Sequence, residues 1–379
     1  MTTLNTSKTL ACSELQVVHC GDCREVKSRH PHIGDLVSEQ DLSTYATFSG
    51  ACDEFPLFFY FLDRSDRPCA YFRVIPDQAV VDDHRIPWAW TGDNFTVPKY
   101  RGQGLSTKLQ AAATKYLHER GIARGSVFST EVTLHIFKKI GIPLVGHVPR
   151  FVALRSVHPL LDAHLSNRAI KRALAVAGHL AVKAVELWAA TYARRWRHGT
   201  CWVAADELDD SDLQQLLDNT KGSHDGHFST DLCMMRKKLA LAARAGDVKW
   251  DVLCDSGSSQ PIAYAILRQR LQSKPLAEKY SNFSLMTLLD FGIAKSDARG
   301  AAAVLGHLVH QFLNSQADVL EIISADAQLN RLARRCGLIP AGKGMSFSSA
   351  FPEKHFAARG PMSVHQWPLT HFCGDAFTL

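Results

Sequence analysis

Val97-Pro98-Lys99-Tyr100-Arg101-Gly102-Gln103-Gly104-Leu105-Ser106-Thr107-Lys108-Leu109 is the stretch that decides the fold. It joins an apolar, strand-like run at 88–97 to a helical run at 105–120 through a basic turn with two glycines. A strand that ends in such a turn and opens a helix gathers unpaired backbone N–H groups, and the helix dipole adds positive potential there. The glycines let the backbone approach a ligand closely. The stretch therefore predicts a site for a phosphate or pyrophosphate at the start of a helix.

The segments around this turn alternate between apolar runs and amphipathic helices. Residues 55–62 and 68–75 are apolar runs separated by the polar segment 63–67, which predicts a β-hairpin. The helical run carries an apolar stripe and ends at Gly121, as helices commonly do. Farther on, the pattern predicts a strand at 126–130, a helix at 132–140 and strands at 143–149 and 151–154. This order predicts an α/β (α+β) fold in which helices flank a mixed central sheet.

The segment from Arg101 to Ser106 resembles the pyrophosphate loop of the GNAT superfamily of acyl-CoA N-acyltransferases. That loop reads Gln/Arg-x-x-Gly-x-Gly/Ala, and this segment matches five of its six places. Ser106 takes the place of Gly or Ala, and its small side chain still lets a phosphate approach. Family members also carry a Leu-Tyr-x-Lys-x-Gly-Phe-like segment after the fifth strand, where this chain has Ile136-Phe137-Lys138-Lys139-Ile140-Gly141-Ile142. With both motifs, residues 38–155 are similar to a GNAT domain.

The same order of segments returns in the second half of the chain. An apolar strand at 283–291 is followed by a helix opened by Arg299-Gly300, a strand at 318–324 and a helix that ends at Gly337. The interval from Arg101 to Gly141 is 40 positions and that from Arg299 to Gly337 is 38, which supports a second copy of one unit. In that copy Ala302 replaces the second loop glycine and Asp297 brings a negative charge, and both changes oppose a pyrophosphate.

The domain organisation predicted from these patterns is a tandem of two GNAT-like domains joined by a helical linker. The predicted ranges are an irregular N-terminal segment at 1–35, a GNAT domain at 36–160, the linker at 161–200 and a degenerate GNAT-like domain at 201–379. The alanine-rich helix at 167–197 is interrupted by His179, Lys183 and Glu186, so it is not a convincing membrane span. Two interpretations of it stay open: a helix packed on both halves, or a surface that meets membrane lipid or an acidic partner.

Composition excludes few classes of protein. Of 379 residues, 46% are hydrophobic and 21% charged, as in ordinary globular domains, and the net charge of +6 suits an anionic ligand without marking a nucleic-acid binder. The first residues show no basic-then-apolar signal segment. Ten cysteines lack the spacing of a disulfide framework, and Cys20 and Cys23 form a single Cys-x-x-Cys without a second pair for zinc. These features predict a cytoplasmic protein with reduced thiols.

The resemblance implies a role for each part of the predicted site. Acetyl-CoA or another acyl-CoA would be the donor, and no metal is expected. The edge formed by Phe95, Thr96 and Val97 would contact the pantetheine arm. The pyrophosphate would lie on the loop residues Arg101, Gly102, Gln103, Gly104, Leu105, Ser106 and Thr107.

Two carboxylates on the neighbouring strands are candidate general bases. Asp93 stands late on the predicted fourth strand and Glu131 at the end of the fifth, and each could act directly or through water. Each is also compatible with a solvated strand end, and Thr130 before Glu131 fits a helix N-cap equally well.

The departure from the family pattern that matters most is Phe137. Many members have a tyrosine there, whose phenol protonates the leaving thiolate, and a phenylalanine cannot do so. Either Ser129, Thr133 or His135 serves instead, or the thiolate leaves unassisted and takes a proton from water.

Three functions follow from these observations. The first is an acyl-CoA-dependent N-acyltransferase, most simply an N-acetyltransferase, that acts on the primary amine of a small molecule. The second is the same transfer with an acyl carrier protein as donor, for which the basic residues 194–198 are the hint. The third is a non-catalytic acyl-CoA-binding sensor or scaffold. The sequence favours no nucleic-acid partner and no integral membrane segment, and it leaves homo-oligomers open.

Overall fold

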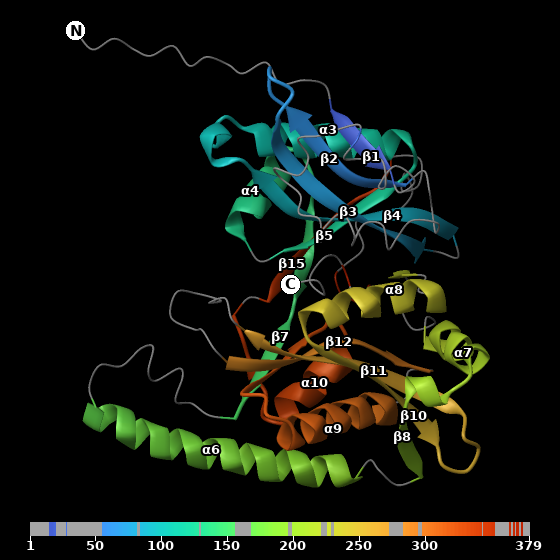
Figure 1. Ribbon diagram of the computed structural model, residues 1–379. Helices are drawn as coiled ribbons and strands as arrows, with labels where there is room; N and C mark the ends of the chain where they lie inside the picture. The colour runs from blue at the N-terminus through green and yellow to red at the C-terminus, as the bar shows by residue number, and fades with distance from the viewer. Residues whose placement is uncertain are drawn as a thin grey trace. The chain divides into compact units, whose positions relative to one another are not determined.

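The fold follows from two copies of one β-α-β arrangement, each of which builds its own sheet (Figure 1). The computed structural model describes residues 15–19, 28, 55–81, 84–128, 130–155, 168–195, 199–220, 226–228, 231–272, 283–294, 298–342, 344–352, 364, 367, 369–370 and 373. Most of the predicted N-terminal segment, including Cys20 and Cys23, lies outside these residues. The chain divides into two compact units. The first comprises residues 1–79, 83–146 and 346–362, and the second comprises residues 80–82, 147–345 and 363–379.

The sheet of the first unit has the strand order β1-β2-β3-β4-β5-β15-β6. Its strands are β1 (Gln16–His19), β2 (Pro56–Leu62), β3 (Pro68–Val81), β4 (His84–Thr96), β5 (Ala123–Phe128), β6 (Leu144–Val148) and β15 (Met345–Ala350). The predicted hairpin is confirmed, because β2 and β3 pair antiparallel around the turn at 63–67. The irregular segment predicted at 1–35 was wrong at residues 16–19, where two adjacent valines pack as an edge strand against β2. Four residues are too few for a periodic signal.

One helix crosses between the parallel strands of this sheet. β4 and β5 run parallel and are joined by α3 (Leu105–Glu119), which contacts β2, β4 and β5. Leu105, Leu109, Ala113 and Leu117 are buried at helical spacing, as the sequence predicts. α4 (Glu131–Lys139) follows and ends at Gly141, whose φ of +76° and the Ile142 N–H to Phe137 O bond of 2.9 Å form a glycine C-terminal motif.

The second unit repeats this arrangement. Its sheet has the order β14-β7-β13-β12-β11-β10-β8, in which β12 and β13 are parallel and joined by α9. α9 and α10 cover one face of the sheet with a core of aliphatic side chains, while α7 contacts β11 and β12. The elements are β7 (Arg150–Leu154), β8 (Thr200–Ala204), α7 (Asp210–Thr220), β9 (Gly226–Phe228), α8 (Leu232–Ala242), β10 (Asp247–Asp255), β11 (Pro261–Gln272), β12 (Phe283–Ile293), α9 (Ala298–Asn314), β13 (Val319–Ile323), α10 (Ala327–Arg335) and β14 (Ile339–Pro340).

Strands from each half of the chain join the sheet of the other half, and besides the strands described next, β9 pairs with β3. β15, from the end of the second half, lies between β5 and β6 in the first sheet, and it pairs with β5 from Arg124 to Phe128. β7, from the end of the first half, lies between β13 and β14 in the second sheet. The two domains were predicted as contiguous ranges, so the prediction leaves out the strands that each half contributes to the other sheet. Periodicity reveals that a strand exists, but it does not reveal which sheet the strand joins.

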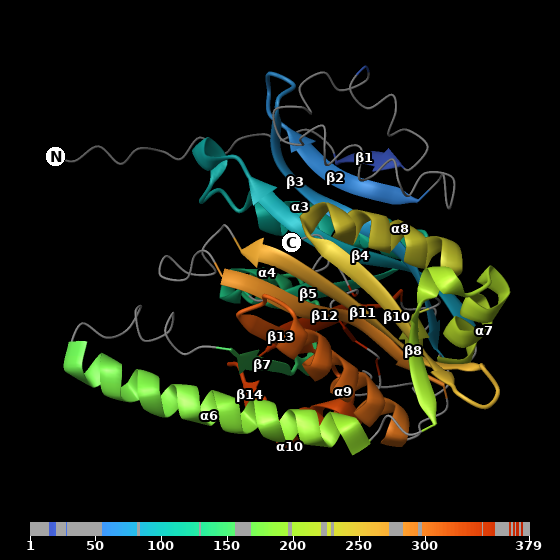
Figure 2. The same ribbon diagram turned by 60° about the horizontal axis from the view of Figure 1, so that its bottom comes forward.

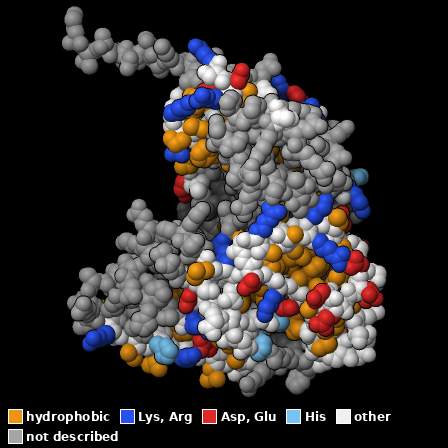
Figure 3. All heavy atoms as spheres, in the orientation of Figure 1, with side chains coloured by type: hydrophobic (Ala, Val, Ile, Leu, Met, Phe, Trp, Pro, Cys, Tyr) orange, Lys and Arg blue, Asp and Glu red, His pale blue; other side chains and the backbone are white. Residues whose placement is uncertain are grey.

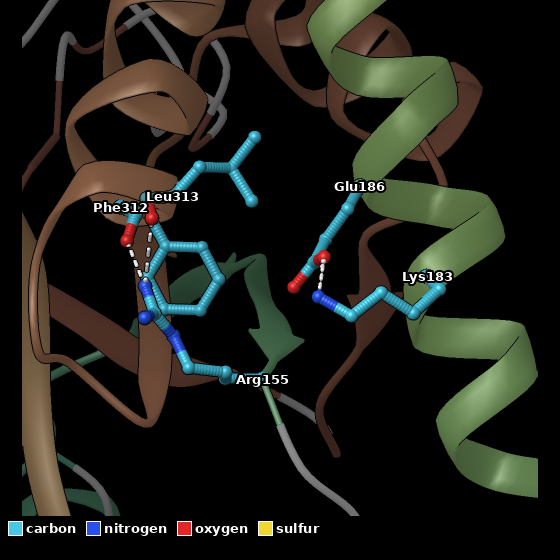
Figure 4. A network of polar contacts seen from close by, with 5 residues as sticks. All are labelled: Arg155, Lys183, Glu186, Phe312 and Leu313. Carbon is cyan, nitrogen blue, oxygen red and sulfur yellow. Dashed lines mark hydrogen bonds and ion pairs between the residues drawn. The ribbon is translucent and has the colours of Figure 1, made fainter.

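The range predicted as the linker contains one long helix, α6 (Arg168–Arg195), which belongs to the second unit and lies along α9 (Figures 1 and 2). Arg155, directly after β7, donates to the carbonyls of Phe312 and Leu313 at the end of α9, with a distance of 3.3 Å to Leu313 O. A guanidinium at this position satisfies carbonyls that a helix end leaves open. Figure 4 shows Arg155 opposite the Lys183–Glu186 pair of α6.

Candidate functional site

The turn at residues 101–104 leaves the start of α3 open. Gly102 and Gly104 have φ values of +79° and +72°, in the region that glycine adopts without strain. Gly104 is the N-cap of α3 and provides no side-chain hydrogen bond, and the first intrahelical bond runs from Lys108 N–H to Gly104 O at 3.0 Å. The backbone N–H groups of residues 105–107 therefore have no partner within the helix.

Space and charge at this turn both suit an anion. A Cβ placed on Gly102 or Gly104 would meet nothing within 4 Å, so the backbone is accessible from outside. The first turn of α3 holds no acidic residue, and Lys99 and Arg101 are exposed beside it. The helix dipole and these cations give the site positive potential.

Two polar contacts tie the turn to the end of β4. Arg101 Nε donates to Thr96 O at 3.1 Å, and its guanidinium lies 5.9 Å from the centre of the Phe95 ring. Asn94 Nδ2 donates to Ser106 Oγ at 2.5 Å. The serine that departs from the family pattern therefore joins β4 to the first turn of α3.

The buried side chain of Tyr100 anchors the turn to the β2–β3 hairpin through a hydrogen bond. The Tyr100 hydroxyl donates to Asp63 in the β2–β3 turn, and the Asp63 carboxylate also accepts the N–H groups of Ser65 and Arg67. Burial by itself would raise the pKa of Asp63, but the bonds from Tyr100 and from the two amides outweigh it and hold that pKa below its usual value. The hydrogen bond to Asp63 raises the pKa of Tyr100. These hydrogen bonds hold Tyr100, at the start of the turn, in a defined position.

β4 and β5 pair over only a short length, which ends several residues before the turn. Their parallel register runs from Trp88 to Trp90 on β4, whereas β4 continues to Thr96. Where this pairing ends, side chains bridge the two strands: Thr91 Oγ1 donates to Gly125 O at 3.3 Å, and Ser126 Oγ donates to Thr91 O at 3.0 Å. The end of β4 from Asn94 to Thr96 thus lies beyond its paired register with β5 and beside the start of α3.

Arg124 on β5 is the residue of this region that sequence reasoning missed. It is 1% exposed and has no acidic partner among the described contacts. Its guanidinium donates to Thr91 Oγ1 at 3.1 and 3.2 Å, to Thr114 Oγ1 at 2.5 Å, to Gln110 O at 3.2 Å and to the Gln110 amide oxygen. Burial lowers its pKa to about 9. Arg124 thereby links both strands to α3, and no sequence motif marks an arginine for that role.

Phe137, which stands where the family has tyrosine, is a packing residue. It is 2% exposed, clusters with Ile136, Ile142 and Ala350, and lies 4.9 Å from the Arg124 guanidinium. A ring on a buried guanidinium gains from a cation–π contact. The other candidate acids have different surroundings: Thr133 Oγ1 bonds to Thr130 Oγ1 at 2.7 Å, and His135 is exposed. Ser129 lies outside the described residues.

The predicted edge and bases lie as follows. Phe95 is 38% exposed. Val97 N–H donates to Cys69 O of β3 at 3.0 Å. Because successive amides of a strand point to opposite edges, the Thr96 N–H points away from β3. Asp93 lies in β4, and its side chain is outside the described part of the structure. Glu131 is exposed in the first turn of α4, next to Thr130, whose side chain accepts the Thr133 N–H as an N-cap.

The corresponding turn of the second unit is closed where it is described. A Cβ on Gly300, in the first turn of α9, would clash with Ile293 of β12, so that helix start packs directly against the strand. Gly300 therefore lacks the open space that surrounds Gly102 and Gly104. Within the described residues no group of His, Cys, Asp or Glu side chains is placed to hold a metal ion.

Comparison with known proteins finds likeness in structure and none in sequence. No family model and no curated protein matches the chain. A conserved protein of Enterococcus faecalis, described as a probable N-acyltransferase, aligns with a TM-score of 0.55 and 10% identity over 89% of this chain and 72% of its own. N-myristoyltransferase of Saccharomyces cerevisiae with bound myristoyl-CoA gives 0.57 and 9% over 92% and 84%. A GCN5-related N-acetyltransferase of Anabaena variabilis gives 0.52 and 12% over 89% and 73%. The predicted GNAT fold is confirmed.

Proposed function

We propose that this protein is an acyl-CoA-dependent N-acyltransferase that acts on the primary amine of a small molecule, with acetyl as the simplest acyl group. The observation that carries the proposal is the open start of α3, with unpartnered amides and two positive-φ glycines, beside the end of β4. An N-terminal helix site next to a strand edge suits a pyrophosphate with an extended arm. Proteins of the same fold described as acetyl- and myristoyltransferases support this choice of reaction.

Different residues of the first unit would bind the donor and stabilise the charge that develops on its thioester. The amides of residues 105–107 and the Arg101 guanidinium would hold the pyrophosphate of the donor, which supplies a thioester. Phe95 and Val97 would line the pantetheine arm, and the outward amide of Thr96 would donate to the thioester oxygen as charge develops.

The transfer itself needs one base and one proton for the leaving group. Asp93 or Glu131 would take the proton of the amine, whose nitrogen forms the new C–N bond while the C–S bond breaks. The coenzyme thiolate would take its proton from water, because Phe137 is buried and carries no donor.

Binding of the donor is tested with coenzyme A alone. Thermal unfolding of the wild type is expected to shift upward with coenzyme A. Gly104→Trp fills the open turn and should abolish the shift. Gly141→Trp is the matched control, since Gly141 has a φ of +76° and also has open space around it, but it closes α4 away from the turn. A wild type that coenzyme A does not stabilise would contradict the proposal.

Catalysis is tested by release of free thiol from acetyl-CoA with a panel of amines. Asp93→Asn and Glu131→Gln separate the two candidate bases, since the variant that removes the base should lower kcat by about 100-fold or more. The buried Phe137 favours one second candidate, a non-catalytic acyl-CoA sensor. Binding of coenzyme A without turnover of any amine at any acyl length would favour that candidate.

A further inference from the structure

α6 presents two different faces along its length. Gly178, Val182 and Glu186, four residues apart, are half-buried, and the helix contacts α9. Val176, Leu180 and Leu187 share another face, and they are 64%, 65% and 73% exposed. Helices of globular proteins normally turn such residues inward, so an exposed apolar row needs an explanation.

The charge of α6 is strongly one-sided. Its 28 residues include six Lys or Arg and a single acid, Glu186. Three of the basic residues, Arg168, Lys171 and Arg172, fall in the first five positions, and Arg194 and Arg195 are the last two. Glu186 is 18% exposed and lies 2.6 Å from Lys183 Nζ, so the one negative charge is already paired (Figure 4). The helix thus has an excess of basic residues, with most of them at its two ends.

We propose that the outer face of α6 binds in the plane of a bilayer surface rich in anionic lipid. An apolar row flanked by basic residues is the pattern of helices that lie in the headgroup region. At about 1.5 Å per residue the helix is about 42 Å long. Figure 3 shows apolar and basic side chains together on the part of the surface that α6 forms. Within the described residues no helix is long and apolar enough to cross a membrane.

Other occupants fit this face less well. A second copy would bring the same basic helix against itself, and like charges repel. A protein partner normally buries a few large anchors in pockets. Here Ala173, Ala177 and Ala184 are exposed between the larger residues, and the 46% exposed Trp188 adds an aromatic ring of the kind found where a helix lies at a membrane surface.

The experiment is flotation of the full chain with vesicles. Vesicles of equal parts phosphatidylcholine and phosphatidylserine should carry the protein, pure phosphatidylcholine vesicles should not, and added salt should release it. Leu180→Glu and Leu187→Glu should each weaken binding by about tenfold or more, because a leucine that would enter the bilayer surface is replaced by a charge. Leu271→Glu is the matched control, because Leu271 of β11 is 68% exposed in the same unit.

Several results would overturn the proposal. It fails if the anionic vesicles do not bind the wild type, or if Leu187→Glu and Leu271→Glu bind equally well. A dimer that is lost in Leu187→Glu without any vesicle binding would assign the face to a second copy. Binding only to an acidic protein would assign it to that class. Thermal unfolding of each variant checks that it is folded, and vesicle binding does not depend on coenzyme A, so this result is independent of the proposed activity.

Discussion

Replacement of Arg124 by methionine tests the internal support of the candidate site. Methionine is unbranched and adaptable, so it fills most of the space without the charge. The change removes every donor that Arg124 directs at Thr91, Gln110 and Thr114. Thr91 and Thr114 keep other contacts, since Thr91 Oγ1 donates to Gly125 O and Thr114 Oγ1 donates to Gln110 O at 2.7 Å.

The free-energy change can be worked out from what stays buried. Gln110 is 3% exposed, and among the described residues only Arg124 donates to its amide oxygen, so Arg124→Met leaves that oxygen unsatisfied. An orphaned buried acceptor costs about 1–3 kcal/mol. We expect Arg124→Met to lower the free energy of unfolding by about 2 kcal/mol, or roughly 4–8 °C in the unfolding temperature of a unit of this size. Arg124→Met/Gln110→Leu removes both partners and should recover most of the loss.

Urea unfolding of the wild type, both single variants and the double variant measures this cycle. The single Gln110→Leu variant should also be destabilised, because it leaves the buried guanidinium without one acceptor. A loss under about 0.5 kcal/mol in Arg124→Met would refute the role given to the hydrogen bonds. A double variant no more stable than Arg124→Met would show that Arg124 acts through something other than Gln110.

Three further changes have distinct expected outcomes. Gly125→Ala should destabilise the first unit by about 1–3 kcal/mol in urea unfolding, because its Cβ would clash with the buried Trp88 ring. The lowered pKa of Asp63 stabilises the fold above about pH 4, and this contribution is lost as the pH falls through the folded pKa. Asp63→Asn should therefore differ most from the wild type at neutral pH, and the difference should shrink in acid unfolding. Ser106→Ala should keep coenzyme A affinity in calorimetry and change stability by under about 0.5 kcal/mol, because its bond to Asn94 is exposed.

Much of the fold could be predicted because its signals are local. The turn at 101–104 lies between an apolar strand and a helix with buried residues at helical spacing, and Gly121 and Gly141 end their helices with positive φ. The strand exchange could not be predicted, because pairing partners are chosen by long-range packing. The local sequence around Phe347 does not indicate that its strand joins the first sheet, and the sequence around Phe151 does not indicate that its strand joins the second.

The candidate site likewise has parts that follow from local sequence and parts that depend on long-range contacts. The turn at 101–104 is a property of a few consecutive residues, so its glycines and Arg101 could be predicted from the sequence. Arg124 could not, since its role depends on Thr91, Gln110 and Thr114 meeting across two strands and a helix. A buried arginine without a carboxylate partner is rare, and sequence patterns place arginine on the surface. The meaning of Phe137 likewise changes only once its ring is seen on that guanidinium.

The strand exchange explains why the second half of the chain still affects the candidate anion site, even though the start of α9 is closed at Gly300. β5 carries Arg124 and Gly125, and along its other edge it is paired from Arg124 to Phe128 by β15, a strand from the far end of the chain. Without β15 that edge would expose a row of unpaired backbone groups, and β6 would lose its neighbour in the sheet. The second half of the chain therefore completes the sheet on which the turn at α3 stands, whether or not its own helix start binds anything. Because this pairing joins distant parts of the sequence, we expect it to slow the folding of the first sheet.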